Sequence, residues 1–225
     1  MIERPDNLTD LVFTAIRDRI VDSSLSPGSP VSEAMLSKEL HVSKTPVREA
    51  LLRLRRIGLV EPTTRGLRVT LPSARTVRNA FEYRASLEDG SGRYAAARAS
   101  AEQLDAIARW AAESLTAQEG EPGDFWRLDF QFHLAVATAS GNDYMRSAVE
   151  DAFVLTLALR QRDVALVRDF VPDALEHIEI ADALRDGDGP AAGSLLSAHV
   201  LRILDQLIRA MDPVEPLTTS SPPRK

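Results

Sequence analysis

Four polar side chains occupy positions where the sequence predicts the buried faces of helices. Asp129 and His133 are four residues apart in an aromatic-rich helical segment, and His177 and His199 follow among aliphatic residues of two later segments. A buried carboxylate without a partner is costly, and one divalent cation is a partner that all four side chains could share. Three imidazole nitrogens and one carboxylate oxygen suit Zn²⁺, Ni²⁺ or another first-row ion, and they leave a coordination position for water or a ligand oxygen.

A metal-free interpretation of these residues stays open. Any one of the histidines alone is more often a hydrogen-bonded core residue than a metal ligand, because histidine is commonly part-buried. In that case Asp129 pairs with a histidine and no ion is present. The convergence of three of the chain's four histidines with one carboxylate favours the metal site.

A second candidate site is a cluster of cations on a short predicted helix nearer the N-terminus. One helix begins after Ser32, His41 lies in a tight turn, and a second helix begins after Ser43 with Pro46 in its first turn. Gly58 follows the last apolar residue of the second helix and should end it. Apolar residues recur along one face of that helix, and its opposite face and ends carry Lys44, Arg48, Arg53, Arg55 and Arg56.

A small β-hairpin is predicted at 59–70, directly after this helix. Thr63, Thr64, Arg65 and Gly66 form its polar turn, with Arg65 at the tip. Two helices, a tight turn and a basic hairpin are the layout of a winged helix-turn-helix. Its second helix suits the major groove of DNA, and its hairpin tip suits the phosphates or the adjacent minor groove.

The charge distribution separates a DNA-binding helix from an ordinary solvated one. Residues 31–72 carry eight Lys and Arg against four Asp and Glu, a net charge of +4. The whole chain carries −6, and residues 73–225 carry −8 because residues 1–72 sum to +2. A local basic region on an acidic protein is typical of a DNA contact, so we expect a double-stranded DNA partner.

The remaining elements are predicted to be helical. A helix at about 8–23, with Leu8, Leu11, Val12, Ile16 and Ile20 on one stripe, should pack beneath the second helix of the motif. Ser100 and Gln103 form a capping box, and Gly141-Asn142 and 187–189 break the later pattern. The helical patterns after the hairpin are at about 73–99, 101–118, 123–140, 143–168, 172–186 and 190–211.

These patterns predict a mainly α protein with two domains. Residues 1–72 form the winged helix-turn-helix, and residues 73–211 form an antiparallel bundle of six helices, or seven. Residues 212–225 are rich in Pro, Ser and Thr and are expected to be a disordered tail. Gly90 and Gly92 lie inside a helix, where each costs up to about 1 kcal/mol against alanine, and the sequence gives no reason for them.

Composition excludes several other classes of protein. The chain has no Cys, which rules out disulfides and thiolate metal sites. It has no apolar run of the roughly 18 residues that cross a bilayer, and its first residues lack the apolar segment of a signal peptide. We therefore expect a cytoplasmic protein with no membrane partner.

The segment VSKTPVREALLRLRRIGLVE, followed by the pair Arg65-Gly66, resembles the signature of the GntR family of bacterial transcription regulators. The resemblance implies that four residues at the start of the recognition helix touch base edges or phosphates, with two more at the wing. These are Ser43, Lys44, Thr45 and Arg48, and Arg65 and Gly66; we add Arg53 from the basic face of the helix.

Residues 73–211 are similar to the all-helical FCD effector domain of the FadR subfamily of GntR regulators. Six helices would place the chain in the VanR-like branch. Metal-binding members of that family use an Asp and a His four residues apart plus two later His, a pattern that Asp129, His133, His177 and His199 match. The stretch from Arg84 to Glu88 also resembles a family motif, which implies that Arg84 pairs with an effector carboxylate. An ordinary i,i+4 salt bridge to Glu88 is the alternative.

We interpret the chain as a metal-dependent, ligand-responsive transcription regulator that binds a pseudo-palindromic operator as a homodimer. The resemblance implies a repressor, because most members of the family are repressors. A small organic acid would bind the open metal position and Arg84, favour one arrangement of the bundle and so shift the DNA-binding domains.

One alternative is a metal-dependent hydrolase with an accessory DNA-binding module; against it, Glu176 and Glu179 beside His177 should face outward or sideways and supply no base. The other alternative is a metal-free regulator whose bundle only dimerises. The sequence does not indicate the effector, the operator or the native metal.

Overall fold

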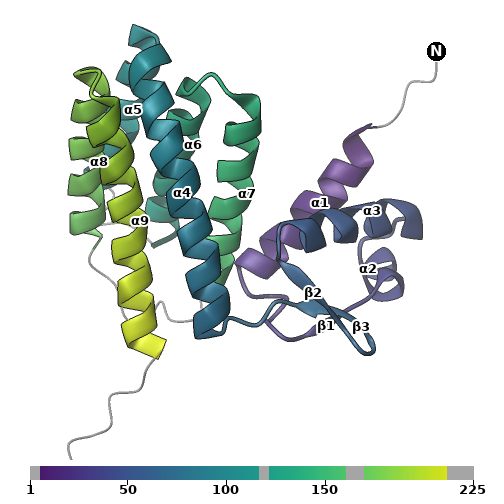
Figure 1. Ribbon diagram of the computed structural model, residues 1–225. Coiled ribbons are helices and arrows are strands. Elements are labelled where there is room, and N and C mark those ends of the chain that lie inside the picture. The colour runs from purple at the N-terminus through teal and green to yellow at the C-terminus, as the bar shows by residue number, and fades with distance from the viewer. Residues whose placement is uncertain (1–5, 117–121, 161–169, 212–225) are drawn as a thin grey trace, which may run out of the picture.

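The computed structural model describes residues 6–116, 122–160 and 170–211. Two compact parts follow one another along the chain, an N-terminal winged helix-turn-helix and a C-terminal bundle of helices (Figure 1). We call them the head and the bundle. The mainly α architecture and the two-part organisation of the fold confirm the sequence prediction. Residues 117–118 and 161–168, at the ends of two predicted helices, and the predicted tail at 212–225 lie outside the described residues.

The head consists of three helices and a small sheet. They are α1 (Asp6–Val21), β1 (Pro30–Val31), α2 (Glu33–Glu39), α3 (Lys44–Arg56), β2 (Val60–Thr63) and β3 (Gly66–Val69). The sheet order is β1-β3-β2, with all neighbours antiparallel and Val60 opposite Val69. The predicted hairpin is therefore β2–β3, and β1 is an additional strand that the sequence analysis did not identify.

Local signals set the boundaries of these elements. Ser32 caps α2, because its hydroxyl accepts the Met35 backbone N–H at 3.2 Å. His41 has a left-handed φ of 54° in the turn, and Gly58 has φ 87° just after α3, both where the sequence placed a turn. The expected Ser43 cap is only half right, since Ser43 stands at the N-cap of α3 but its side chain makes no capping hydrogen bond.

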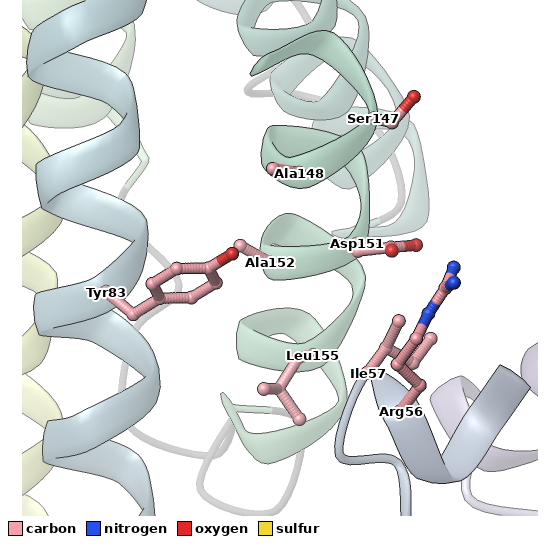
Figure 2. A pocket seen from close by; sticks show the side chains of 8 residues that line it. All are labelled: Arg56, Ile57, Tyr83, Ser147, Ala148, Asp151, Ala152 and Leu155. Atoms are coloured by element: carbon pink, nitrogen blue, oxygen red, sulfur yellow. The ribbon is translucent and has the colours of Figure 1, made fainter. Parts of the chain in front are cut away.

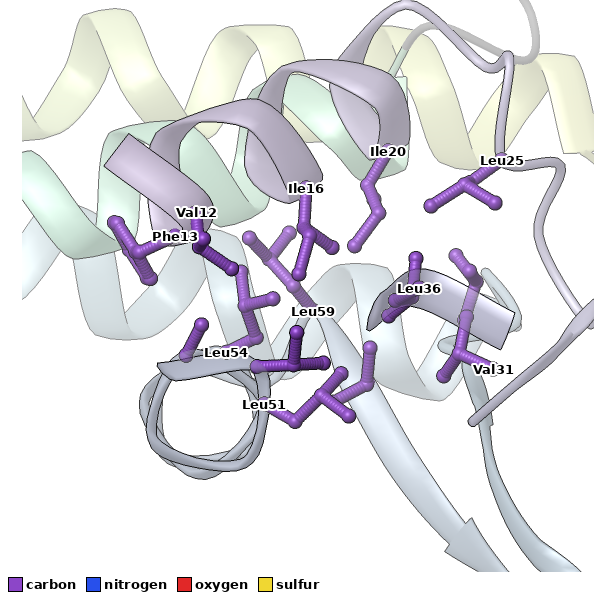
Figure 3. Close-up of a cluster of buried hydrophobic side chains, with 14 of the residues drawn as sticks. Val12, Phe13, Ile16, Ile20, Leu25, Val31, Leu36, Leu51, Leu54 and Leu59 are labelled. Atoms are coloured by element: carbon purple, nitrogen blue, oxygen red, sulfur yellow. The ribbon is translucent and has the colours of Figure 1, made fainter. Parts of the chain in front are cut away.

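The core of the head lies between α1, α3 and the sheet (Figure 3). Ile16, Leu36 and Leu54 are fully enclosed there, so α1 does pack beneath α3 as predicted. The apolar stripe predicted for α1, however, included two residues that are exposed. Leu8 and Leu11 are 41% and 58% exposed, because the buried side of α1 turns toward Phe13 instead.

The bundle is built from six helices in the part of the chain that the structure describes. They are α4 (Ala74–Arg98), α5 (Ala101–Thr116), α6 (Pro122–Ala139), α7 (Asp143–Arg160), α8 (Val171–Arg185) and α9 (Gly189–Met211). Ser100 and Gln103 make the predicted capping box before α5. None of the described helices combines the length and the apolar character that a membrane crossing requires.

Close packing of α4 against α9 explains one of the two helical glycines. A Cβ at Gly92 would lie 2.6 Å from Leu196 Cδ1 and 3.0 Å from the backbone of Ala192. Across the same contact, a Cβ at Gly193 would lie 2.6 Å from the backbone oxygen of Asp89. Glycines on both helices therefore let the two backbones approach (Figure 1). Gly90 faces only the mobile end of Met145, 2.8 Å from its would-be Cβ.

The contrast between the backbone contact at Gly193 and the side-chain contact at Gly90 predicts different effects of alanine on stability. Gly193→Ala should lower the free energy of unfolding by about 1–3 kcal/mol, because backbone atoms must move apart to admit the methyl group. Gly90→Ala should be neutral or stabilising by up to about 1 kcal/mol, since Met145 can swing away and alanine favours the helix. Urea unfolding followed by circular dichroism measures both variants. Equal midpoints for the two variants would contradict the assignment of a backbone contact to Gly193.

Candidate metal centre and nucleic-acid interface

The structure brings the four predicted ligands to one point inside the bundle. Asp129 and His133 project from α6, His177 from α8 and His199 from α9, and each is no more than 2% exposed. One potential ligand atom from each of the four lies within 4.8 Å of the others. The spatial convergence that the sequence predicted is therefore present.

The atoms that face this point lack ordinary partners. Within the described part of the chain, the Nε2 atoms of His133, His177 and His199 and Oδ1 of Asp129 are buried without a hydrogen bond. His133 Nε2 and His177 Nε2 each lie 3.3 Å from Asp129 Oδ1. A hydrogen-bonded core would satisfy such atoms, because each unsatisfied buried polar atom costs about 1–3 kcal/mol. A set of inward-facing lone pairs is instead what a metal ion needs, so the residues present fit a divalent cation.

Two carboxylates hold the rings from outside. Glu88 on α4 contacts Nδ1 of His133, and Glu176 Oε2 lies 2.6 Å from Nδ1 of His199. Each contact directs the opposite nitrogen, Nε2, toward the centre, as outer carboxylates do for metal-bound imidazoles. His177 is oriented differently, by stacking on Phe132 with ring centroids 4.1 Å apart.

Sequence analysis missed both of these carboxylates. Glu176 was expected to face outward or sideways. Its side chain is 29% exposed and does lie sideways, but it reaches across to α9, where it contacts His199 and Arg202. Its position next to His177 was the available signal, but only the packing of α8 on α9 decides the contact. Glu88 had been considered only as a helix partner of Arg84.

The electrostatics of the cluster keep its carboxylates charged. Burial alone would raise the pKa of Glu88, but Arg84 and His133 outweigh it and lower that pKa to about 2. Burial also opposes ionisation of Asp129, yet the neighbouring imidazoles of His133 and His177 hold its pKa well below the usual range. Burial lowers the pKa of His177 to about 4, whereas for His133 the Glu88 charge outweighs burial and raises the pKa. Asp129 is thus a carboxylate and His177 a neutral imidazole, the forms that bind metals.

Arg84 makes the ion pair with Glu88 that was one of its two alternatives, while its pairing with an effector carboxylate stays a prediction. Its Nε lies 2.5 Å from Glu88 Oε1, which is the i,i+4 salt bridge. Its guanidinium also lies 4.2 Å over the Phe153 ring, and Nη1 is 3.3 Å from Thr156 Oγ1. Nη2 is buried with no hydrogen-bond partner among the described residues. Arg84 therefore keeps one donor available beside the cluster.

A second network of charged residues adjoins the cluster. Asp173 on α8 is 3% exposed and lies between Arg202 on α9 and Arg160, whose Nη2 is 3.6 Å from Asp173 Oδ2. The Arg160 guanidinium lies 4.2 Å over Trp126. Burial lowers the pKa of Arg160, even though Asp173 and Asp129 oppose the shift. Two buried arginines, Arg84 and Arg160, thus lie near Asp129.

The predicted DNA-binding residues fall into two groups on the surface of the head. Ser43, Lys44, Thr45 and Arg48 are all exposed at the N-terminal end of α3. Arg65 and Gly66 are exposed at the turn between β2 and β3, where Gly66 has φ 132°. The recognition helix and the wing therefore both present the predicted side chains to solvent.

Arg53 lies apart from the start of α3 and from the wing. Its Nη1 is 2.5 Å from Asp10 Oδ1, and its guanidinium lies 4.1 Å over the Phe13 ring, so it is engaged with α1. Arg48, by contrast, extends from the start of the second turn of α3 and pairs with Glu33 of α2 through two 2.8 Å contacts.

Two family models match the chain. Residues 8–66 match the bacterial regulatory proteins of the gntR family, and residues 79–202 match the FCD domain. A Paenarthrobacter nicotinovorans protein named "Probable D-xylose utilization operon transcriptional repressor" is 31% identical over 86% of this chain and 87% of its own length. The HTH-type transcriptional repressor RspR of Escherichia coli K12 is 27% identical, over 87% of each chain.

Solved structures show the same fold. Escherichia coli McbR/YncC superposes with a TM-score of 0.75 at 21% identity, covering 92% of this chain and 99% of that one. A GntR transcriptional regulator from Rhodococcus sp. RHA1 gives 0.70 at 25% identity, covering 90% and 98%. These relatives are regulators, not enzymes, which removes the hydrolase alternative. The chain belongs to the GntR family of bacterial transcription regulators and carries an FCD domain.

Proposed function

We propose that this regulator binds a divalent metal ion through Asp129, His133, His177 and His199, and that a small carboxylate effector acts at this site to control operator binding. The observation that carries the proposal is the set of four inward-facing ligand atoms that have no hydrogen-bond partner within residues 6–116, 122–160 and 170–211. Zn²⁺ and Ni²⁺ suit three imidazoles and one carboxylate. The ion would supply a Lewis-acidic position for an effector oxygen.

The balance of buried charge supports an anionic effector. Among the described buried residues, Arg84 and Arg160 contribute two positive charges, and Glu88, Asp129 and Asp173 contribute three negative ones. With the histidines neutral, as metal ligands are, the formal sum is −1. A divalent ion changes that sum to +1, and a monocarboxylate would neutralise it. Buried charge without compensation is costly, so the metal and the carboxylate each favour the binding of the other. The free Nη2 of Arg84 would donate to the carboxylate.

On the head, we propose that Ser43, Lys44, Thr45 and Arg48 contact the major groove, with Arg65 and Gly66 at the wing. The exposed N-terminal end of α3 supports this assignment, and the engagement of Arg53 with α1 leaves that residue a structural role. We further propose domains at 1–72 and 73–211 and a repressor of the FadR subfamily, VanR-like branch, to which six bundle helices correspond.

We also propose that the regulator is a homodimer on a pseudo-palindromic operator. Tyr83 and Tyr94 on α4 and Tyr144 on α7 are exposed, Tyr144 by 90%. Exposed aromatic residues are typical of protein interfaces, which supports a second copy packed against α4 and α7.

Elemental analysis tests the metal. Protein purified without a nickel column should contain about one equivalent of a first-row metal, and EDTA treatment should lower its melting temperature by several degrees, because a ligand that prefers the folded state stabilises it. Returning Zn²⁺ or Ni²⁺ should restore the melting temperature. Less than about a tenth of an equivalent, with no stabilisation by either ion, would favour the metal-free alternative.

A further inference from the structure

Two pairs of consecutive residues connect the metal cluster to the head. Asp129 and Phe130 are neighbours on α6, and Phe153 and Val154 are neighbours on α7. Asp129 is a proposed ligand, whereas Phe130 packs against the hydrophobic core of the head. Val154 belongs to that core and is 8% exposed, although it comes from the bundle. In each pair, one residue therefore faces the cluster and the next enters the head.

Phe153 completes the connection on the cluster side. Its ring is buried beneath the Arg84 guanidinium at 4.2 Å, and its centroid is 5.6 Å from that of His133. The rings of Phe130 and Phe153 meet edge to face, with centroids 5.2 Å apart. A single layer of two phenyl rings thus separates His133 and Arg84 from the core of the head.

The contact between head and bundle is narrow beside this layer. A cleft of about 320 Å³ opens between the end of α3, which contributes Arg56 and Ile57, and the bundle residues Asp151 and Tyr83 (Figure 2). Arg56 and Asp151 approach this cleft from opposite sides, and among the described residues no direct ion pair joins them. Beside this cleft the head and α7 meet through apolar residues such as Ile57 and Leu155, and the charges of Arg56 and Asp151 attract one another across it.

Close-packed interiors transmit displacement, because side chains in them have few voids to move into. A shift of His133 or Arg84 on binding an ion or a carboxylate would press on Phe153. Phe153 contacts Phe130 on the side away from His133, and its own turn of α7 carries Val154, so that pressure would act on both residues. Both residues pack in or against the core of the head.

We propose that the Phe130–Phe153 ring pair is the relay through which binding at the cluster changes the position of the head, with Val154 as the point where α7 is anchored in the head core. This inference rests on the proposed metal site and adds the route by which that site controls the recognition helix. Binding shifts the head only to the extent that the two arrangements bind the ion differently.

Hydrogen exchange of the full-length protein with and without Zn²⁺ tests the relay without knowledge of the effector. In the wild type, Zn²⁺ should change the exchange rates of backbone amides in α1 and α3 by at least about fivefold, the lower end of typical allosteric coupling. In Phe130→Leu and Val154→Ala, that ratio should fall toward one. Zn²⁺ stoichiometry, measured on the same samples, should stay at about one.

Two matched variants serve as controls. Phe81→Leu and Val77→Ala remove the same groups from a buried cluster between α4, α7 and α9, none of whose buried members belongs to the head core. They should reduce stability to a similar degree and keep the full response of the head to Zn²⁺. A response that survives in Phe130→Leu and Val154→Ala, or one that the controls lose equally, would overturn the relay. Absence of Zn²⁺ uptake by the wild type would instead overturn the proposed metal site, and the relay with it.

Discussion

Replacement of Arg48 by alanine is expected to lower operator affinity by about 10²- to 10⁴-fold. Arg48 is the fifth residue of α3 and lies near the N-terminal end, where a recognition helix in the major groove meets base edges. Its guanidinium already holds two acceptors at once, since Nε and Nη2 each lie 2.8 Å from an oxygen of Glu33. A guanine edge offers a similar pair of acceptors, each such contact is worth about 1–3 kcal/mol, and a homodimer makes it twice.

The Glu33 contact does not prevent this role. The Arg48 side chain is 62% exposed and that of Glu33 33%, and exposed ion pairs of this kind contribute little to stability. Arg48 can therefore leave Glu33 for DNA at little cost. For the same reason Arg48→Ala should leave the head folded, which the melting temperature can establish before any binding experiment.

Fluorescence anisotropy with an operator selected from random duplexes measures the effect at a fixed salt concentration. Arg53→Ala is the matched control, because it removes the same charge from the same helix at a position that faces Phe13 and Asp10. Arg53→Ala should weaken binding far less than Arg48→Ala. Affinity within threefold of wild type for Arg48→Ala, at matched salt, would remove Arg48 from the interface. A stoichiometry of one chain per duplex would argue against the homodimer.

The head shows which features a sequence can predict. Ser32, the His41 turn and Gly58 act through their own backbone geometry, so the ends of α2 and α3 followed from local residues. The direction of the Arg53 side chain could not be predicted in this way, because it depends on where α1 places Phe13 and Asp10. The two-residue strand β1 also could not be predicted from the sequence, since only its pairing with β3 makes it a strand.

Some features of the metal cluster could likewise be predicted from the sequence and others could not. Helical periodicity was enough to place Asp129 and His133 on one buried face, and the four side chains do meet. The outer carboxylates could not be assigned, because whether Glu88 reaches α6 and Glu176 reaches α9 depends on how far each helix is shifted along its neighbour. The need for glycine at position 193 could not be predicted either, since it arises from close contact with a backbone atom of another helix.

The other large effect is expected from His199→Ala, which should reduce bound metal from about one equivalent to less than about a tenth. His199 is 1% exposed, and it supplies one of the three imidazole nitrogens. Loss of one of the four ligands strongly reduces the affinity for the ion, because only two imidazoles and one carboxylate then remain to bind it. The fold should survive, since Glu176 keeps its contacts with Arg202 after His199 is gone.

His41→Asn is the matched control for this variant, because it removes the chain's remaining histidine from an exposed turn of the head, where asparagine tolerates the left-handed backbone. Elemental analysis should find wild-type metal content in His41→Asn, and Zn²⁺ should still raise its melting temperature. In His199→Ala, Zn²⁺ should raise the melting temperature by much less than in the wild type, since stabilisation by a ligand follows its affinity for the folded state. Full metal content in His199→Ala would mean that the ion lies elsewhere, and the orphaned nitrogens around Asp129 would then need another explanation.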